Sequence, residues 1–504
     1  MSPSLATGAA VLVPFLGAAA IAALHRHPNP REAVSLVTAA ILFGLVASLL
    51  PEVSTGERPA AVLAEPLPGL ALAFEVEPLG LMFAGVSSFL WIVTSLYSIG
   101  YMRGNRERNQ TRYYIYFALA LSATIGVAFA ANLFTLFVFY EALTLSTYPL
   151  VAHRGTDEAR ASGRTYLAIL LSTSFAFLLL AIILTWNLAG TLNFVPGGIL
   201  RDKASPWMTV VLLALYAFGI GKAALMPFHR WLPAAMVAPT PVSALLHAVA
   251  VVKAGVFSVV KVIVYVFGVD HLASTPGAEW LLYIAGFTVI VASLIALRQD
   301  NLKLRLAYST VSQLSYVVVA ATILSPLSVM GAALHIAAHA FGKITLFFAA
   351  GSISTAAHKT EVSQLDGIGR RMPWTMGAFA VGSLSMIGLP PTASFVSKWY
   401  ILFGALEVEN MVAPAIIIAS TLLNATYFLP IVYAAFFKPE TQPTGGHGQA
   451  PAVGREHVEP NPDHGEAPLP IVIAVTGTAA LTILMFLFPD AALGLAEQLV
   501  GRTP

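Results

Sequence analysis

The sequence has no cysteine and little charge. Of its 504 residues, 10% are Asp, Glu, Lys or Arg, whereas about 25% is usual for a soluble protein. The shortage of charge excludes a soluble enzyme with a polar surface, a disordered chain and a nucleic-acid-binding protein. The absence of cysteine excludes disulfide bonds, cysteine-ligated iron–sulfur clusters and thiol nucleophiles. Neither GxGxxG nor GxxxxGK[ST] occurs, so we expect no nucleotide site and no bound cofactor.

Apolar residues dominate what is present. Hydrophobic residues make up 57% of the chain, and the mean hydropathy is +0.77. A helix needs about 20 apolar residues to cross the ~30 Å hydrocarbon core of a bilayer. The sequence therefore predicts an all-α polytopic membrane protein with fourteen transmembrane helices. The predicted spans are 6–25, 33–51, 77–99, 112–130, 132–151, 164–186, 208–226, 240–267, 278–297, 304–323, 326–354, 374–403, 411–437 and 469–495.

The basic residues lie mainly in alternate loops. Eighteen of the 27 Lys and Arg residues fall in one set of loops, and four fall in the other set. The positive-inside rule places the richer set in the cytoplasm. This predicts a multi-pass protein of a bacterial cell (inner) membrane with both termini outside. The remaining five basic residues are lysines inside predicted spans.

Two predicted spans contain helix breakers next to a lysine. Lys222 lies in GIGKAALMPFHRWLP, and Lys398 lies in IGLPPTASFVSKWY. Proline removes a backbone donor and clashes with the preceding turn. Broken helices persist at membrane depth where protein or a wet cavity surrounds them. Spans 7 and 12 are therefore predicted to be discontinuous. Because they lie five spans apart, the two units would have opposite topology, which is typical of inverted repeats.

These features divide the chain into five predicted parts. Three transmembrane helices occupy residues 1–111. A segment rich in Pro, Gly, His and charge, 438–468, is predicted to be a flexible cytoplasmic loop. The other predicted parts are a first five-helix half-channel repeat (112–268), a second, inverted five-helix repeat (276–437) and a C-terminal transmembrane helix (469–504).

One acid and five lysines lie inside predicted spans. Each charge costs at least about 2.5–3.5 kcal/mol near the bilayer centre, and such residues usually mark ion or proton paths. We expect Glu141 and Lys222 to form a buried pair whose separation moves a proton. Lys253, near the centre of its span, and Lys398, beyond the second break, are further candidate carriers. Structural pairing and snorkelling to the surface are the alternatives, and both roles stay open for Lys261.

A histidine stripe follows in the eleventh span. His335, His339 and Lys343 are spaced by four residues, so they share one face of a helix. Histidine titrates near neutral pH, which suits a proton relay. The HxxxH spacing also fits a metal, but no third ligand is evident and we predict no metal site; ordinary packing is the other alternative. His247, six residues before Lys253, is an additional candidate for the relay.

Together these motifs identify a family. The chain resembles the antiporter-like, proton-conducting membrane subunits of respiratory NADH:quinone oxidoreductase, membrane-bound hydrogenases and Mrp multisubunit cation/proton antiporters. The resemblance covers most of the chain, roughly 75–437, and rests on FYEALTLSTYPLV with Glu141, GKAALMPFHRWLPAAM with Lys222, PTPVSALLHAVAVVKAG with Lys253, DNLKLRLAYSTVSQLSY, HIAAHAFGKITLFF, and GLPPTASFVSKWY with Lys398. It implies fourteen helices, two inverted five-helix half-channels and proton movement through these residues and the span-eleven histidines. The short C-terminus and the lysine of the span-twelve motif look most like the MrpD type of antiporter subunit.

The resemblance implies a function but not the energy source. The first hypothesis is a proton-translocating subunit of a Na+(K+)/H+ antiporter, working in the bilayer with other membrane subunits of an Mrp-type complex and not an enzyme by itself. The alternative is a proton-pumping subunit of a respiratory NADH:quinone oxidoreductase or membrane-bound hydrogenase complex. A stand-alone solute transporter is disfavoured because no large polar cleft is evident. A packing scaffold is disfavoured by the cost of burying charge.

Overall fold

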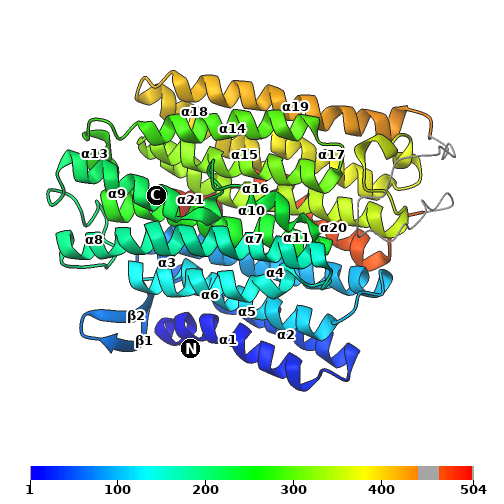
Figure 1. Ribbon diagram of the computed structural model, residues 1–504, viewed down its shortest axis with the longest axis horizontal. Coiled ribbons are helices and arrows are strands. Elements are labelled where there is room, and N and C mark those ends of the chain that lie inside the picture. The colour runs from blue at the N-terminus through cyan, green and yellow to red at the C-terminus, as the bar shows by residue number, and fades with distance from the viewer. Residues whose placement is uncertain (1, 441–464, 502–504) are drawn as a thin grey trace.

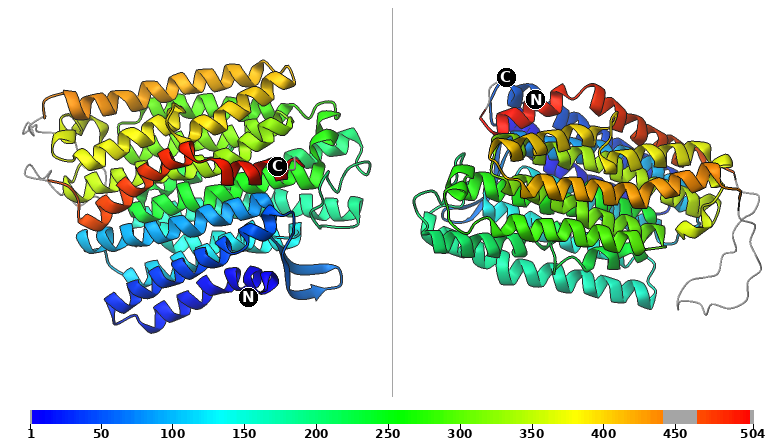
Figure 2. Two further views of the ribbon diagram at one scale, coloured as in Figure 1. Left: turned by 180° about the vertical axis from the view of Figure 1, so that it is seen from behind. Right: turned by 90° about the horizontal axis from the view of Figure 1, so that it is seen from above.

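The protein is a bundle of helices that run side by side along its long axis. The computed structural model describes residues 2–440 and 465–501. The common helix direction is visible from the front (Figure 1) and from behind and above (Figure 2). Nine helices in the described ranges are long and apolar enough to cross a membrane. The predicted all-α membrane fold is confirmed in kind. The count of fourteen stays a prediction, because the other predicted spans fall on helices that are shorter, interrupted or less apolar.

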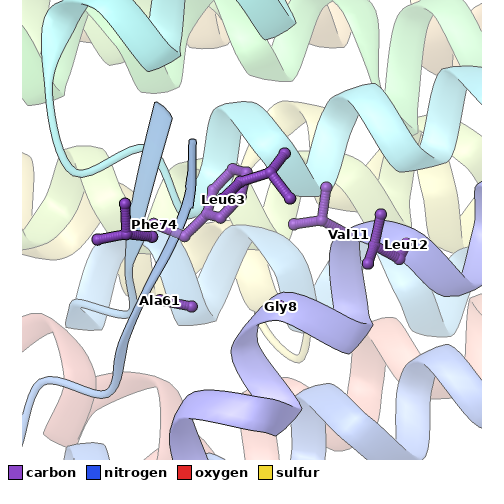
Figure 3. A pocket seen from close by; sticks show the side chains of 7 residues that line it. Gly8, Val11, Leu12, Ala61, Leu63 and Phe74 are labelled. Carbon is purple, nitrogen blue, oxygen red and sulfur yellow. The ribbon is translucent and has the colours of Figure 1, made fainter. Parts of the chain in front are cut away.

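The N-terminal part contains a β-hairpin that the sequence did not lead us to expect. Strands β1 (Ala60–Leu67) and β2 (Leu70–Glu75) pair antiparallel. Their apolar side chains and those of α1 line a shallow crevice (Figure 3). Because its lining holds no titratable side chain, the crevice is not a candidate site. The helices of this part are α1 (Pro3–Ala23), α2 (Pro28–Ala47), α3 (Leu50–Ser54) and α4 (Pro78–Gly104).

The next part is rich in interruptions. Three short π-helical turns occur in it, and such turns are frequent at functional sites. The predicted break at Lys222 is confirmed, because α9 ends at Gly219 and the next α-helix begins at Trp231. The elements are α5 (Gln110–Ala128), α6 (Leu133–Val151), α7 (Asp157–Thr173), η1 (Ser174–Leu178), α8 (Leu179–Ala189), α9 (Pro206–Gly219), η2 (Gly221–Ala223), α10 (Trp231–Ala234), η3 (Ala235–Val237), α11 (Thr240–Ala244), η4 (Leu245–Val249), α12 (Val251–Lys261), η5 (Val262–Phe267) and α13 (Val269–Ala273).

The following part surrounds one long buried helix, α16. This helix packs against α15, α17 and α18, and also against α12, α4 and α20 from other parts of the chain. The second predicted break is confirmed between Ile387 and Ala393. The elements are α14 (Trp280–Arg298), α15 (Leu302–Thr322), α16 (Pro326–Ala356), η6 (Val362–Gln364), η7 (Ile368–Arg370), α17 (Pro373–Ile387), α18 (Ala393–Glu407) and α19 (Val412–Phe437).

Two helices form the C-terminal part. The predicted final span, 469–495, is wrong at its end, because α20 (Leu469–Leu487) stops before Pro489 and α21 (Asp490–Leu499) is a separate helix. Most of the predicted loop 438–468 lies outside the described residues. Both marked chain ends lie toward the end of the bundle that carries the hairpin (Figure 2).

Candidate proton-transfer site

The first helix break places Lys222 in the interior. Helix α9 ends at Gly219 because the chain passes very close to η1 there: a Cβ at this position would lie 2.4 Å from the Leu178 nitrogen. The three-residue turn η2 then carries Lys222, and Ala224 follows with a left-handed φ of 56°. The lysine side chain is fully buried. The break therefore turns a charged side chain toward the neighbouring helix α6 and away from the surface.

Lys222 is held by neutral oxygen atoms of α6. Its Nζ donates to the Tyr140 carbonyl at 2.8 Å and to Thr144 Oγ1 at 2.5 Å. The same Nζ lies 3.2 Å from the centre of the Tyr140 ring, and the Tyr140 hydroxyl accepts a hydrogen bond from the Lys222 amide at 3.0 Å. Charge-assisted hydrogen bonds are worth about 1.5–3 kcal/mol each, so these contacts stabilise a charged lysine in this position.

Glu141, the predicted partner, is a neighbour of Lys222 without touching it. The carboxylate interacts electrostatically with Lys222. In the described part of the chain, however, it forms no ion pair within 4.0 Å, and neither of its buried oxygens has a hydrogen-bond partner. Leaving a buried carboxylate unsatisfied is costly. The predicted pair is thus present in its separated arrangement.

The lysine at the centre of α12 joins the two predicted halves. Lys253 Nζ and His339 Nδ1 on α16 share a hydrogen bond of 2.5 Å, and both side chains are fully buried. Two residues further along α12, Gly255 lies directly against the first break. A Cβ at Gly255 would lie 2.3 Å from the Lys222 carbonyl carbon. Only glycine lets α12 approach the η2 backbone this closely.

The histidine stripe on α16 lies in the core as predicted, but its rings stack. His335 and His339 have ring centroids 6.0 Å apart and an interplanar angle of 19°. The ring nitrogens of His335 are both engaged elsewhere: Nδ1 with Ser397 Oγ at 2.8 Å and Nε2 with Gln313 Oε1 at 3.0 Å. The two histidines are therefore close, while their nitrogens serve different partners.

Lys343 completes the stripe and has a serine as its partner. Its Nζ donates to Ser309 Oγ at 2.9 Å. The segments YEALTLSTY (140–148) and YSTVSQLSY (308–316) match at both terminal tyrosines when they are aligned. In that alignment, Ser309 takes the position of Glu141. The second half therefore has a hydroxyl where the first half has a carboxylate.

The second break positions Lys398. Its Nζ donates to the carbonyls of Met386 at 3.0 Å and Ile387 at 2.8 Å, which end helix α17. The C-terminus of a helix carries partial negative charge, which favours a cation there. Gly388 makes room for this arrangement: it has φ of 89°, and a Cβ there would lie 2.5 Å from Lys398 Cδ. The amine also faces the Tyr316 ring, 4.8 Å from its centre.

Lys261 forms an ion pair that the sequence did not reveal. Its Nζ lies 3.3 Å from Glu77 Oε1 and donates to the Ala130 carbonyl at 2.8 Å. Glu77 caps α4 by accepting from the amides of Leu79 and Gly80, and it also accepts from the Tyr265 hydroxyl at 2.9 Å. Because every group in this cluster is satisfied, its geometry is that of a structural tie between α4, α12 and the loop after α5.

The structure thus brings most predicted residues into one buried path. Glu141 and Lys222 lie at one break, Lys253, His339, His335 and Lys343 follow on α12 and α16, and Lys398 lies at the other break. The side chain of His247 lies outside the described residues. No cluster suited to a metal occurs within 2–440 and 465–501. The sequence analysis missed the polar groups that hold the path: Tyr140, Thr144, Ser309, Gln313, Tyr316 and Ser397.

Comparison with known proteins decides the family. Residues 130–424 match the family described as "NADH:quinone oxidoreductase/Mrp antiporter, TM". The chain belongs to this family. The N subunit of the NADH-quinone oxidoreductase of Desulforudis audaxviator is 32% identical over 446 residues, which are 88% of each chain. The large antiporter protein of Alkalihalophilus pseudofirmus, which belongs to a Na(+)/H(+) antiporter, is 29% identical over 95% of this chain and 61% of that protein.

Antiporter-family structures share the fold. A chain in the structure of the Mrp complex from Dietzia sp. superimposes with a TM-score of 0.85, at 21% identity, over 99% of this chain and 97% of that chain. The fold predicted from the resemblance is therefore confirmed. The present chain spans less than two thirds of the Alkalihalophilus protein, so the two proteins differ in extent.

Proposed function

We propose that this chain is the proton-translocating subunit of a multisubunit Na+(K+)/H+ antiporter in a bacterial inner membrane, with both termini outside. Protons move through the buried relay of Glu141, Lys222, Lys253, His339, His335, Lys343 and Lys398, with His247 as a further candidate. The hydrogen bond between Lys253 and His339 carries this proposal, because it joins the two predicted halves through two titratable groups. The excess of basic residues in alternate loops supports the orientation.

Lys222 is the switch of the first half. With Glu141 protonated, its attraction for Lys222 ends, and the lysine stays on Tyr140 and Thr144. With Glu141 ionised, the lysine is drawn toward the carboxylate, and two buried charges then stabilise each other. Movement of Lys222 between these positions changes its attraction for the proton that Lys253 carries. The separated arrangement in the structure corresponds to the first of these states.

A redox-driven complex is the second candidate function. The 32% identity to the Desulforudis oxidoreductase protein over 88% of both chains favours it. The same relay would then be driven by chemistry in other subunits, because this chain has no cysteine and no nucleotide motif. Partners in either case are other membrane subunits, and the two functions differ in whether transport requires a cation gradient or a reductant.

Expression of the complete gene cluster in a strain without cation exporters tests the proposal. The cluster should restore growth in high sodium at alkaline pH, and inverted membrane vesicles should exchange sodium for protons. Glu141→Ala and Lys222→Ala should each remove the exchange, whereas Lys203→Ala, at an exposed loop lysine, should not. Unchanged exchange in the first two variants would refute the relay. Proton movement that needs a reductant and ignores sodium would favour the second function.

A further inference from the structure

The contacts of His335 determine which of its nitrogens carries hydrogen. The Met386 carbonyl can only accept, so the Gln313 NH2 group must face it, and these atoms are 3.5 Å apart. The Gln313 oxygen then faces His335 Nε2 at 3.0 Å. Because that oxygen can only accept, Nε2 carries a hydrogen. A neutral His335 in this site therefore has a bare Nδ1.

The Ser397 hydroxyl lies between two acceptors. Its oxygen is 2.8 Å from His335 Nδ1 and 3.0 Å from the Ser394 carbonyl. When His335 is neutral, the hydroxyl donates to Nδ1. When Nδ1 is protonated, it donates to Ser397, and the hydroxyl turns to the Ser394 carbonyl. Rotation of one hydroxyl thus satisfies the hydrogen bonds of either protonation state in the same packing.

We propose that Gln313 fixes neutral His335 as the Nε2–H tautomer, and that His335 gains and loses its proton only at Nδ1, through Ser397. The proposal rests on the proposed relay and refines it, because His335 becomes a side branch that a proton enters and leaves by the same atom. Its ring faces the rings of His339 and Tyr316, which offer no route for a proton. Gln313 is a positioning residue, and Ser397 is the proton-transfer group.

The transfer balances with Lys398 as the donor. The Lys398 ammonium gives one proton to Ser397 Oγ, directly or through water, while the hydroxyl proton moves to His335 Nδ1. The products are a neutral amine, an unchanged serine and an imidazolium. The reverse step returns the proton. The charge on His335 then acts on Lys398 and Lys253, the two lysines with which it interacts electrostatically.

Nitrogen NMR of the assembled complex tests the tautomer without any transport measurement. Histidine labelled with ¹⁵N gives distinct signals for bare and protonated ring nitrogens, and the His335 signals are those lost in His335→Asn. We expect a bare Nδ1 and a protonated Nε2 in the neutral state, and a mixture of tautomers in Gln313→Leu. A neutral His335 with hydrogen on Nδ1 would overturn the proposal, as would a ring that stays charged at every pH. This result does not depend on which ion is transported.

Serine variants test the transfer route in proteoliposomes of the assembled complex. Ser397→Ala should slow proton movement about 100-fold, the scale of one lost proton-transfer group, and Ser397→Thr should restore most of it. Ser394→Ala is the matched control, because it removes a nearby buried hydroxyl, bonded to Ser385, and keeps the Ser394 carbonyl. Wild-type transport in Ser397→Ala, or equal loss in Ser397→Ala and Ser397→Thr, would overturn the route.

Discussion

The close contact between Gly255 and the first break makes a sharp prediction about distance. Carbon atoms pack best at about 3.5–4.0 Å, whereas a Cβ at Gly255 would lie 2.3 Å from the Lys222 carbonyl carbon and 2.4 Å from the Ala223 nitrogen. Gly255→Ala must therefore push the η2 backbone away from α12 by about 1 Å. Because Lys222 is on η2, its amine moves relative to Tyr140 and Thr144.

The effect on transport should exceed the effect on stability. Overpacking costs about 1–3 kcal/mol, and alanine in a helix recovers about 0.5–1 kcal/mol relative to glycine. We expect the complex to assemble with a loss of at most about 2 kcal/mol. A displacement of about 1 Å at a reacting group can cost about 100-fold, so sodium–proton exchange should fall by about that factor.

The assay is the initial rate of sodium-driven pH change in proteoliposomes, normalised to assembled complex. Gly477→Ala is the matched control, because this α20 glycine has nothing within 4 Å of the added carbon; it should transport like wild type. If Gly255→Ala also transports at the wild-type rate, the dependence of transport on the position of Lys222 is wrong.

Three further predictions concern buried charge. Lys343→Met should stabilise the protein by about 1–4 kcal/mol, because methionine replaces a buried charge, while transport is lost; normal transport would remove Lys343 from the relay. Lys261→Met should cost about 3–5 kcal/mol in denaturation experiments, because it leaves Glu77 buried without its cation, and added Glu77→Gln should recover part of this; purely additive losses would contradict the pairing. His153, in the loop after α6, has its pKa lowered to about 4, mainly by burial and then by repulsion from Arg112. Since the unfolded state binds its proton near pH 6.5, stability should fall by about 3 kcal/mol from pH 6.5 to pH 4, and His153→Gln should lack this part of the pH dependence in thermal melts.

Sequence patterns predicted the parts of the site that local chemistry determines. Glycine and proline next to Lys222 and Lys398 predicted the two breaks, because these residues act on the backbone where they stand. The spacing of His335, His339 and Lys343 predicted one helix face, because helical periodicity is local.

The partners of these residues could not be read from the sequence. Thr144 and Ser397 are ordinary helix residues until packing brings them to Lys222 and His335, which are 78 and 62 residues away. Hydroxyls and carbonyls occur in every helix, so no composition signal distinguishes the few that bind a lysine. The hairpin did leave a local signal, the Pro68–Gly69 dipeptide between two apolar runs, because such pairs mark turns.

The hydrogen bond between Lys253 and His339 is the contact on which the relay depends most. Its direct test is the rate of sodium-driven proton movement by purified complex in proteoliposomes, for Lys253→Met against the exposed-loop control Lys203→Met. The relay predicts a fall of about 100-fold or more for Lys253→Met, with assembly intact and the control unchanged. A wild-type rate in Lys253→Met would contradict it.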